Sequence, residues 1–504
     1  MGRLMARPRG GVQPPTGAGA RPGLSRPHEG NGAVRLGDLA DGLLRGAEGL
    51  REGVTGAFEP TLRLGVTGLA RAGKTVFITS LVANLLERGR MPQLAAAAEG
   101  RIRSAYLRPQ PDDAIPRFPF EEALAALTGP APRWPEPTRA VSQIRLSIRS
   151  QPSGLLGGLQ GPRTLHLDIV DYPGEWLLDL GLMEKDYAGW SRDVLERAAH
   201  RPGGAPFLAL ARVADRGARL DEGEARRLAE SYTESLRAQR AAGYSDCTPG
   251  RFLMPGEMEG SPALTFAPLP PAGGRAPRGS LGREFARRFE AYKDRVVRPF
   301  FRDHFARIDR QVVLVDALGA IHHGPAALED LRRAMADLLG AFRPGRAAWL
   351  TSLLGGRRVG RVLFAASKAD HVHHSQHPRL AAIMAALVDD ARRRADFAGA
   401  RTEAMAIAAL RATTEETIEH GGRSLDCVRG RLLETGREAA FYPGELPADP
   451  ALLLAPAREG AARWLDGEYG EMRFAPAPLT LRPGEGPPHI RLDRAAQFLI
   501  GDRL

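Results

Sequence analysis

The segment from Gly68 to Thr75 reads Gly-Leu-Ala-Arg-Ala-Gly-Lys-Thr, which is the G-x-x-x-x-G-K-T pattern of a phosphate-binding P-loop. Residues 61–67 before it (TLRLGVT) alternate like a buried strand, and residues 76–86 after it (VFITSLVANLL) are typical of an apolar helix. Glycines let backbone N–H groups turn toward a phosphate, and a helix N-terminus adds a favourable dipole. The pattern therefore predicts a strand, loop and helix that form one P-loop unit.

Within this loop the residue types match distinct tasks. The Lys74 ammonium is expected to reach the β- and γ-phosphates, and the Thr75 hydroxyl to ligate Mg²⁺. Arg71 is a candidate to supply positive charge in the manner of an arginine finger, and the alternative is that it points to solvent. The nucleotide-binding residues expected here are Gly68, Ala72, Gly73, Lys74, Thr75 and Val76.

The chain strongly prefers arginine to lysine. It has four lysines, and Lys and Arg together number 70, so 66 are arginines. A lysine that persists is a candidate for a role that needs a compact ammonium rather than a guanidinium fork. Two of the four lysines, Lys74 and Lys368, fall in nucleotide-binding motifs.

Composition describes a soluble globular protein. Of 504 residues, 43% are hydrophobic and 26% charged, which is ordinary for such a protein. The two cysteines, Cys247 and Cys427, form no paired motif, as expected in a reducing cytoplasm. No apolar run approaches the ~20 residues of a membrane span. The net charge is +11, but no aromatic residues are interleaved with the basic ones. This favours a solvated arginine-rich surface over a nucleic-acid partner.

Periodicity predicts a strand–helix alternation after an N-terminal tail. Residues 1–34 read as a disordered basic tail, 36–58 as an amphipathic helix, and 91–137 as an irregular, proline-rich stretch. Strands are expected at 143–150 and 164–171, joined as a hairpin through a flexible turn at 154–161, and at 311–317, 361–366 and 404–410. Helical patterns occur at 182–200, 215–242, 280–308, 325–342 and 378–398, and 244–279 is rich in Pro and Gly.

This order predicts an α/β fold: a P-loop NTPase core with a doubly wound, mostly parallel sheet, GTPase-like, and a largely helical insertion. The expected organisation is a tail at 1–34, core at 35–174, helical insertion at 175–308, and core with a C-terminal extension at 309–504.

A D-x-x-G motif follows the apolar strand at 164–171. Asp171 can hold Mg²⁺ through a water, and the Gly174 N–H can sense a γ-phosphate. Glu175 comes next, where some GTPases have a water-orienting glutamine. A carboxylate there would be repelled by the γ-phosphate unless it is neutralised. Thr138, which precedes the strand at 143–150, is a candidate switch threonine that would ligate Mg²⁺, and the alternative is an ordinary loop residue.

Residues 367–370 (Ser-Lys-Ala-Asp) end the strand at 361–366 and resemble an N/T-K-x-D guanine motif. Asp370 can accept hydrogen bonds from guanine N1 and N2, and the Lys368 stem can lie along the base, but Ser367 departs from the usual Asn or Thr. By position, residues 409–411 (Ala-Leu-Arg) form the loop whose backbone N–H meets the base oxygen, which makes Arg411 a further candidate.

Histidines cluster behind Asp370, at His371, His373, His374 and His377, and His322 and His323 follow the strand at 311–317. No cysteine or acidic set with metal-ligand spacing accompanies them, so a polar loop near the base is favoured over a zinc site.

Several further segments resemble the YcjX-like family of bacterial P-loop NTPases over about residues 36–504. They are GVTGLARAGKTVFITSLV, LDIVDYPGEW, PGRFLMPGEMEGSPALTFAPLP, PFFRDHFARIDRQVVLVDALGA, RVLFAASKADH, FYPGELP and HIRLDRAAQFLIGDRL. The resemblance implies a GTP-binding motif order, a helical insertion, a link to envelope stress, and a neighbouring inner-membrane protein, with the chain cytoplasmic or peripheral at that membrane.

The expected activity is slow hydrolysis of GTP–Mg²⁺ by a stress-related switch. Two alternatives remain open: an ATPase of the same fold, and a nucleotide-gated scaffold whose helical insertion binds a membrane partner.

Overall fold

The computed structural model describes residues 59–504 except 70, 138–139, 154–160, 272–273, 275, 341–358, 398 and 465–468. The predicted tail at 1–34, the helix at 36–58, most of the turn at 154–161, and Thr138 lie outside these residues.

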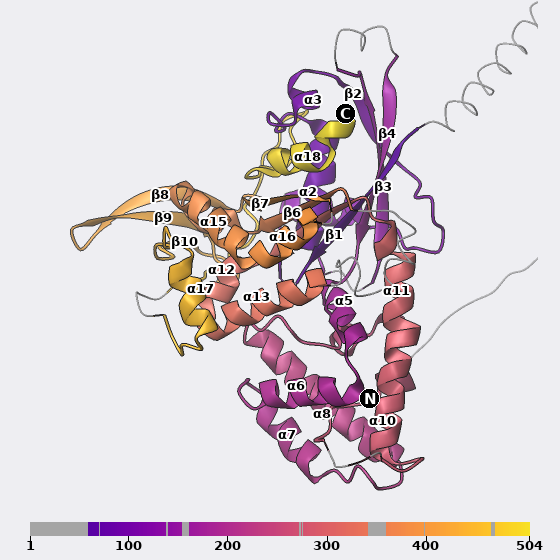
Figure 1. The fold of residues 1–504 in the computed structure, drawn as a ribbon. Coiled ribbons are helices and arrows are strands. Elements are labelled where there is room, and N and C mark those ends of the chain that lie inside the picture. The colour runs from indigo at the N-terminus through magenta and orange to yellow at the C-terminus, as the bar shows by residue number, and fades with distance from the viewer. Residues whose placement is uncertain are drawn as a thin grey trace, which may run out of the picture. The chain divides into compact units, whose positions relative to one another are not determined.

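A seven-stranded sheet forms the centre of the described chain (Figure 1). Its order is β2-β3-β4-β1-β5-β6-β7, and the four neighbouring pairs from β4 to β7 are parallel. The strands are β1 (Thr61–Gly68), β2 (Ile102–Arg108), β3 (Ser142–Ser150), β4 (Arg163–Asp171), β5 (Arg310–Val315), β6 (Arg361–Ala366) and β7 (Arg401–Ala406). The predicted hairpin is confirmed, since β3 and β4 pair antiparallel from Ser142↔Asp171 to Ser150↔Arg163.

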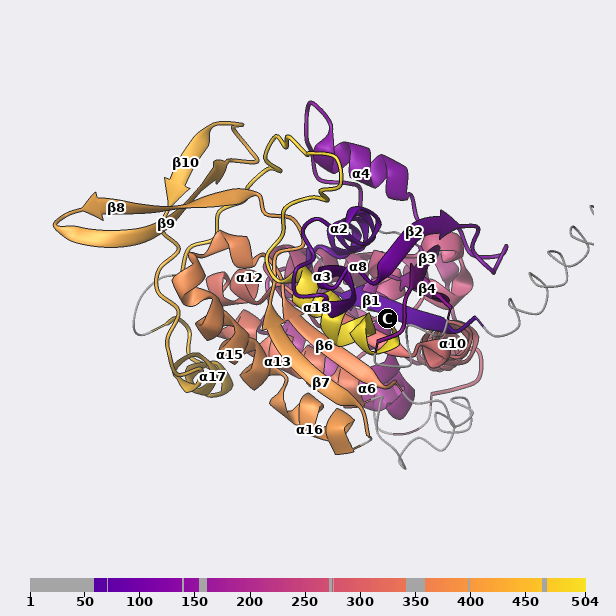
Figure 2. The same cartoon turned by 90° about the horizontal axis from the view of Figure 1, so that it is seen from above.

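Helices cover both faces of the sheet, which confirms the doubly wound α/β fold. Alternate residues of β6 point to opposite sides: Leu363 joins one buried cluster, whereas Phe364 joins the other. On the first side lie α2 (Lys74–Glu87), α3 (Ala95–Ala98), α4 (Phe120–Thr128) and α18 (Leu492–Ile500). On the second side lie α12 (Ala317–His322), α13 (Pro325–Gly340), α15 (His377–Leu387), α16 (Asp389–Phe397) and α17 (Ala451–Arg458) (Figure 2).

Between β4 and β5 the described chain is mostly helical. Its elements are α5 (Gly174–Leu178), η1 (Asp179–Glu184), α6 (Tyr187–Ala198), α7 (Gly204–Val213), α8 (Glu222–Ala241), α9 (Gly250–Leu253), η2 (Gly256–Met258), η3 (Pro262–Leu264), α10 (Leu281–Tyr292), η4 (Lys293–Val297), α11 (Arg298–Asp303) and η5 (Phe305–Arg307). Aromatic rings fill the interior; Trp190 stacks on Phe289 with centroids 4.9 Å apart. We call residues 174–307 the helical segment.

The expectation of an irregular stretch at 91–137 is wrong, because it contains α3, β2 and α4. Prolines near its ends, such as Pro92 and Pro130, favoured an irregular structure in the prediction and outweighed the patterns of these short elements. β2 is an edge strand with half-exposed residues, so its apolar alternation is weak.

Three other boundaries differ from the prediction. The strand expected at 404–410 is β7, which ends at Ala406; Ala408 instead exchanges hydrogen bonds with Ile490 and stays buried in a loop. The helix at 378–398 is interrupted near Val388 into α15 and α16. The helix at 215–242 begins only at Glu222, because the Asp221 side chain caps it by accepting from the Glu224 N–H.

A second, three-stranded sheet was not predicted. It consists of β8 (Thr413–His420), β9 (Arg423–Arg431) and β10 (Glu438–Phe441), all antiparallel. The β8–β9 hairpin extends away from the main sheet in both views (Figures 1 and 2). Its strands are largely polar, as in Thr-Thr-Glu-Glu-Thr-Ile-Glu-His, so they lack the apolar pattern that identifies buried strands.

Candidate functional site

The P-loop connects β1 to α2 as predicted. Gly73 caps α2 with φ 82°, a left-handed conformation that favours glycine, and Arg71 precedes it with φ 64°. The Lys74 Nζ donates to the Gly68 carbonyl oxygen over 2.7 Å, so the ammonium is folded over its own loop. Ala72 N–H donates to Leu69 O over 3.2 Å. The tight loop places Lys74 and Thr75 in the first turn of α2, at the carboxyl end of the central strand.

The D-x-x-G motif lies against this loop. Asp171 is the last residue of β4 and is 1% exposed. A Cβ at Gly174 would lie 2.1 Å from the Gly68 carbonyl oxygen, a distance that no side chain tolerates. The two motifs, about one hundred residues apart in sequence, are therefore in direct backbone contact at the same edge of the sheet.

Glu175 is neutralised by a residue that the sequence analysis did not identify. It lies in the first turn of α5 and is 5% exposed. Its Oε1 lies 3.0 Å from the Nη2 of Arg240, near the end of α8. This ion pair meets the condition stated above for a carboxylate beside a γ-phosphate. Arg240 lies 65 residues along the chain in a helix with many arginines, so no local pattern distinguishes it.

The 367–370 motif follows β6 at the same sheet edge. Asp370 is 5% exposed; its Oδ2 accepts from the Ala412 N–H over 2.8 Å, and its carbonyl accepts from the Thr413 hydroxyl. Lys368 has φ 59°, and its Nζ donates to Asp316 and, over 3.1 Å, to Glu471.

Burial alone would lower the pKa of Lys368, but the carboxylates of Asp316 and Glu471 outweigh it and raise that pKa above its ordinary value. The ammonium is thus charged and fixed in place. Asp316 follows β5 and Glu471 comes from the C-terminal part, so neither could be linked to Lys368 by spacing.

One cavity of about 440 Å³ joins the two ends of this edge. Lys74 and Gly73 line it at the P-loop, Lys368 and Asp370 at the other end, and Arg71, exposed, at its rim. Its volume falls within the range of small-molecule sites. The remaining predicted residues that line it are Ala72, Thr75, Val76 and Glu175, together with the unpredicted Trp134, Arg240, His371, Glu471, Arg473 and Phe474.

Arg411 is not brought into the cavity. Its N–H donates to the Pro488 carbonyl over 2.8 Å and its Nε to the Thr413 carbonyl over 3.1 Å. Ala409 and Leu410 line the cavity instead. The loop at 409–411 therefore reaches the cavity through Ala409 and Leu410 and not through Arg411.

The histidines do not act alike. His371 lines the cavity, packs edge-on against Phe474, and its buried Nδ1 has no hydrogen-bond partner among the described residues. Burial lowers the pKa of His371, so the ring is neutral at pH 7. His373 and His374 instead face Glu415 at the start of β8.

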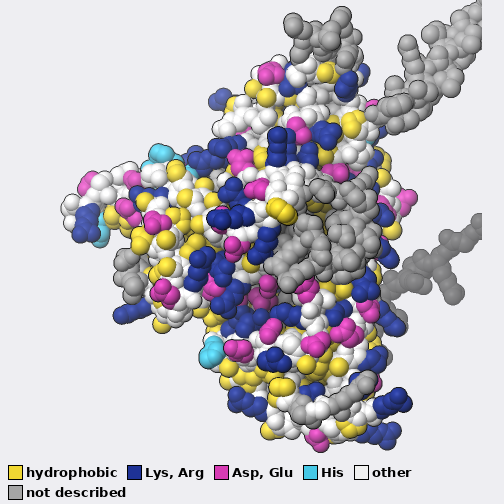
Figure 3. Space-filling model, viewed as in Figure 1, with side chains coloured by type: hydrophobic (Ala, Val, Ile, Leu, Met, Phe, Trp, Pro, Cys, Tyr) yellow, Lys and Arg dark blue, Asp and Glu magenta, His cyan; other side chains and the backbone are white. Residues whose placement is uncertain are grey.

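The surface carries charges of both signs, interspersed on the face shown in Figure 3. Among the described residues, no helix is both long and apolar enough to cross a membrane.

Comparisons with known proteins agree with this geometry. The chain is 38% identical over 456 residues to the "Ras-like GTPase YcjX" of Escherichia coli strain K12, covering 88% of this chain and 96% of that protein. It is 35% identical over 471 residues to the "Ras-like GTPase YcjX" of Shewanella oneidensis strain MR-1, covering 88% and 94%. The profile described as "YcjX-like family, DUF463" matches residues 62–504. The chain therefore belongs to the YcjX-like family of P-loop proteins.

Proposed function

We propose that this protein binds GTP–Mg²⁺ in the cavity and hydrolyses it slowly, as a nucleotide-dependent switch. The observation that carries the proposal is that one cavity joins phosphate-binding chemistry at Lys74 to a buried carboxylate at Asp370. The name that the two relatives share, Ras-like GTPase, supports the same nucleotide. The stress-related role and the inner-membrane partner that the family resemblance implies are parts of this proposal.

Asp370 is the basis for choosing guanine. A carboxylate accepts two hydrogen bonds from guanine N1–H and N2–H, whereas adenine presents a bare N1 acceptor at the same edge. The Ala412 N–H holds the Asp370 Oδ2 at 2.8 Å and so orients the carboxylate before any base arrives.

The donor set at the phosphate end fits Mg²⁺. The Thr75 hydroxyl and the Asp171 carboxylate are both oxygen donors, which Mg²⁺ prefers. When bound, the ion would neutralise charge on the β- and γ-phosphates. Thr138 and Arg71 stay predicted contributors at the γ-phosphate, with roles that follow from their positions in sequence.

We expect slow turnover because of the ion pair between Glu175 and Arg240, which lies at the end of the cavity where the γ-phosphate would bind. Glu175 can accept a hydrogen bond from an attacking water, but its Oε1 is already engaged with Arg240 at 3.0 Å. Water orientation then competes with the ion pair, so we expect turnover below that of an enzyme with a free water-orienting group.

The test separates GTP from ATP. Binding of fluorescent GTP and ATP analogues with Mg²⁺ is measured for wild type, Lys74→Ala, Asp370→Ala and, as a control, the exposed Asp113→Ala. Asp370→Ala is expected to weaken GTP binding by a few kcal/mol, roughly 100-fold, without weakening ATP binding, because the charged hydrogen bonds to the base are lost. Equal GTP and ATP affinities that Asp370→Ala does not change would favour the ATPase.

A scaffold is the second candidate, and Arg240 favours it, because a residue of the helical segment reaches the nucleotide site. In that case nucleotide controls the helical segment and hydrolysis is incidental. Single-turnover phosphate release with and without anionic lipid vesicles tests this idea. A switch enzyme releases phosphate in both conditions, whereas a scaffold binds nucleotide but releases phosphate at a negligible rate in both.

A further inference from the structure

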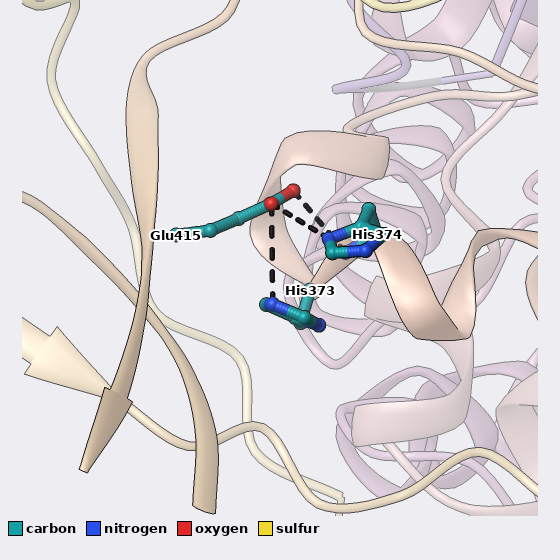
Figure 4. A group of neighbouring side chains, drawn as sticks. All are labelled: His373, His374 and Glu415. Atoms are coloured by element: carbon teal, nitrogen blue, oxygen red, sulfur yellow. Dashed lines mark hydrogen bonds and ion pairs between the residues drawn. The ribbon is translucent and has the colours of Figure 1, made fainter.

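Three side chains from two separate segments converge outside the nucleotide cavity (Figure 4). His373 and His374 lie in the turn before α15, and Glu415 lies near the start of β8. One ligand atom from each lies within 4.8 Å of the other two. The Glu415 Oε2 is 2.8 Å from the His374 Nδ1 and 3.9 Å from the His373 Nε2.

The orientation of His373 is set from behind. Its Nδ1 lies 3.3 Å from the Asp426 Oδ2 and 2.9 Å from the Ser375 Oγ. Asp426 is itself held, since it accepts from the Ser375 hydroxyl over 3.2 Å. A carboxylate on one imidazole nitrogen, with the other nitrogen aimed inward, is the arrangement that metal-binding histidines use.

The Glu415 oxygens are divided in the same way. The Oε1 accepts from the His374 backbone N–H over 3.2 Å and lies 3.8 Å from the Arg411 Nη2, while Oε2 faces the two rings. One carboxylate oxygen therefore faces both imidazole rings, while the other is held by the backbone.

From these contacts we propose that His373 Nε2, His374 Nδ1 and Glu415 Oε2 form a binding site for a divalent transition-metal ion, with Zn²⁺ as the best match. Two imidazoles and one carboxylate are a zinc ligand set that leaves a fourth position to water. Ligand atoms on a tetrahedral zinc lie about 3.4 Å apart, from bonds of ~2.0–2.1 Å. The distances from the Glu415 Oε2, 2.8 Å to His374 Nδ1 and 3.9 Å to His373 Nε2, lie on either side of this value, and the 66% exposed His374 ring has room to adjust.

The site would fasten the turn behind Asp370 to the projecting hairpin. His373 follows Asp370 by three residues, and Glu415 follows Thr413, which donates to the Asp370 carbonyl, by two. The proposal does not depend on which nucleotide the protein binds, and its test uses none.

The test measures Zn²⁺ binding to the full, untagged, metal-stripped chain by competition with a chromophoric chelator. Wild type is expected to bind one equivalent that His374→Ala and Glu415→Gln each weaken at least tenfold. Asp426→Asn changes a residue that, of the three proposed ligands, contacts only His373, through its Nδ1; it should weaken zinc binding by about 10–100-fold. The matched controls are Glu419→Gln and His420→Ala, both exposed on β8, and they should bind as wild type does.

X-ray absorption at the zinc edge gives a second readout, since only nitrogen and oxygen ligands are expected. Circular dichroism shows whether each variant folds. If Glu415→Gln does not fold, Asp426→Asn still tests the proposal. The proposal is overturned if wild type binds no zinc, or if the controls lose as much affinity as His374→Ala and Asp426→Asn do.

Discussion

At the scale of single residues, one glycine allows two motifs to come into contact. The Gly174 Cα faces the Gly68 carbonyl so closely that a Cβ would lie 2.1 Å from the oxygen. The Gly174 Cα and the Gly68 carbonyl both belong to the backbone, so neither can rotate away to make room as a flexible side chain can. The relative position of the P-loop and the D-x-x-G segment therefore depends on glycine at this one position.

Gly174→Ala should separate the two segments. We expect a loss of stability of about 1–3 kcal/mol from overpacking, and weaker binding of GTP analogues. Thermal unfolding and nucleotide titration check this, with Gly181→Ala as control, because a Cβ there meets only the Asp337 Cβ at an ordinary 3.8 Å. Equal behaviour of the two variants would contradict the close approach.

How well each site residue was predicted depends on whether its partners are near in sequence. The strand, loop and helix of the P-loop unit were predicted because the pattern that identifies them lies in neighbouring residues. Arg240 and Glu471 were missed because each meets its partner, Glu175 or Lys368, only through the fold. Glu415 was missed for the same reason, being 41 residues from His374.

At the scale of elements, a buried carboxyl joins three parts of the helical segment. Asp179, at the start of η1, accepts from the Gly250 N–H over 2.8 Å and from the Tyr292 hydroxyl of α10. Burial raises the pKa of Asp179 to about 7, although these two hydrogen bonds oppose the shift. Three elements thus meet at a group that takes up a proton near neutral pH.

Asp179 should make stability depend on pH. Its pKa is raised in the folded state above the unfolded value of 3.8, so its contribution is full below pH 3.8 and is lost as pH rises to about 7. Between pH 5 and pH 7 the free energy of unfolding from this group should fall by roughly 2 kcal/mol. Asp179→Asn should remove that slope in urea unfolding, whereas Asp193→Asn, at a half-exposed surface pair, should keep it.

Elements with strong periodicity were predicted, and those without it were not. β5 and β6 follow continuous apolar runs because both of their faces are covered, and β1 and β3 follow an alternating pattern. β2 and β8 each expose one side, and their polar residues concealed the strand pattern. α18 is an exception: it was not predicted, although its buried residues Leu492, Ala495, Ala496, Leu499 and Ile500 recur at helical spacing and pack it against the sheet.

At the scale of the whole described chain, the helical segment and the sheet share one core. A single buried cluster runs from Trp190 and Phe289 in the helical segment to Phe364 in β6. The Glu175–Arg240 ion pair links α5 to α8 within the helical segment, and both residues line the cavity. A change in the cavity therefore has both a packed and a charged route into the rest of the helical segment.

A double-mutant cycle measures the charged route. Arg240→Ala leaves the buried Glu175 carboxylate without this partner, and should reduce the free energy of unfolding by about 1–3 kcal/mol. In the Glu175→Gln background the same change should have little effect, which gives a coupling of about 1 kcal/mol or more. The exposed Arg117–Glu121 pair is the control, with an expected coupling under about 0.5 kcal/mol. Additive effects at Glu175 and Arg240 would refute the coupling.

The Lys74 ammonium already has an acceptor in the Gly68 carbonyl oxygen, 2.7 Å away. A ligand that binds Lys74 must replace this hydrogen bond, so it gains only the difference in hydrogen-bond strength between its own acceptor and the carbonyl. A neutral hydroxyl gains almost nothing, whereas a phosphate oxygen gains because a hydrogen bond to a charged acceptor is about twice as strong. Lys74 should therefore favour negatively charged ligands, and uncharged metabolites should gain no affinity from it even at high concentration.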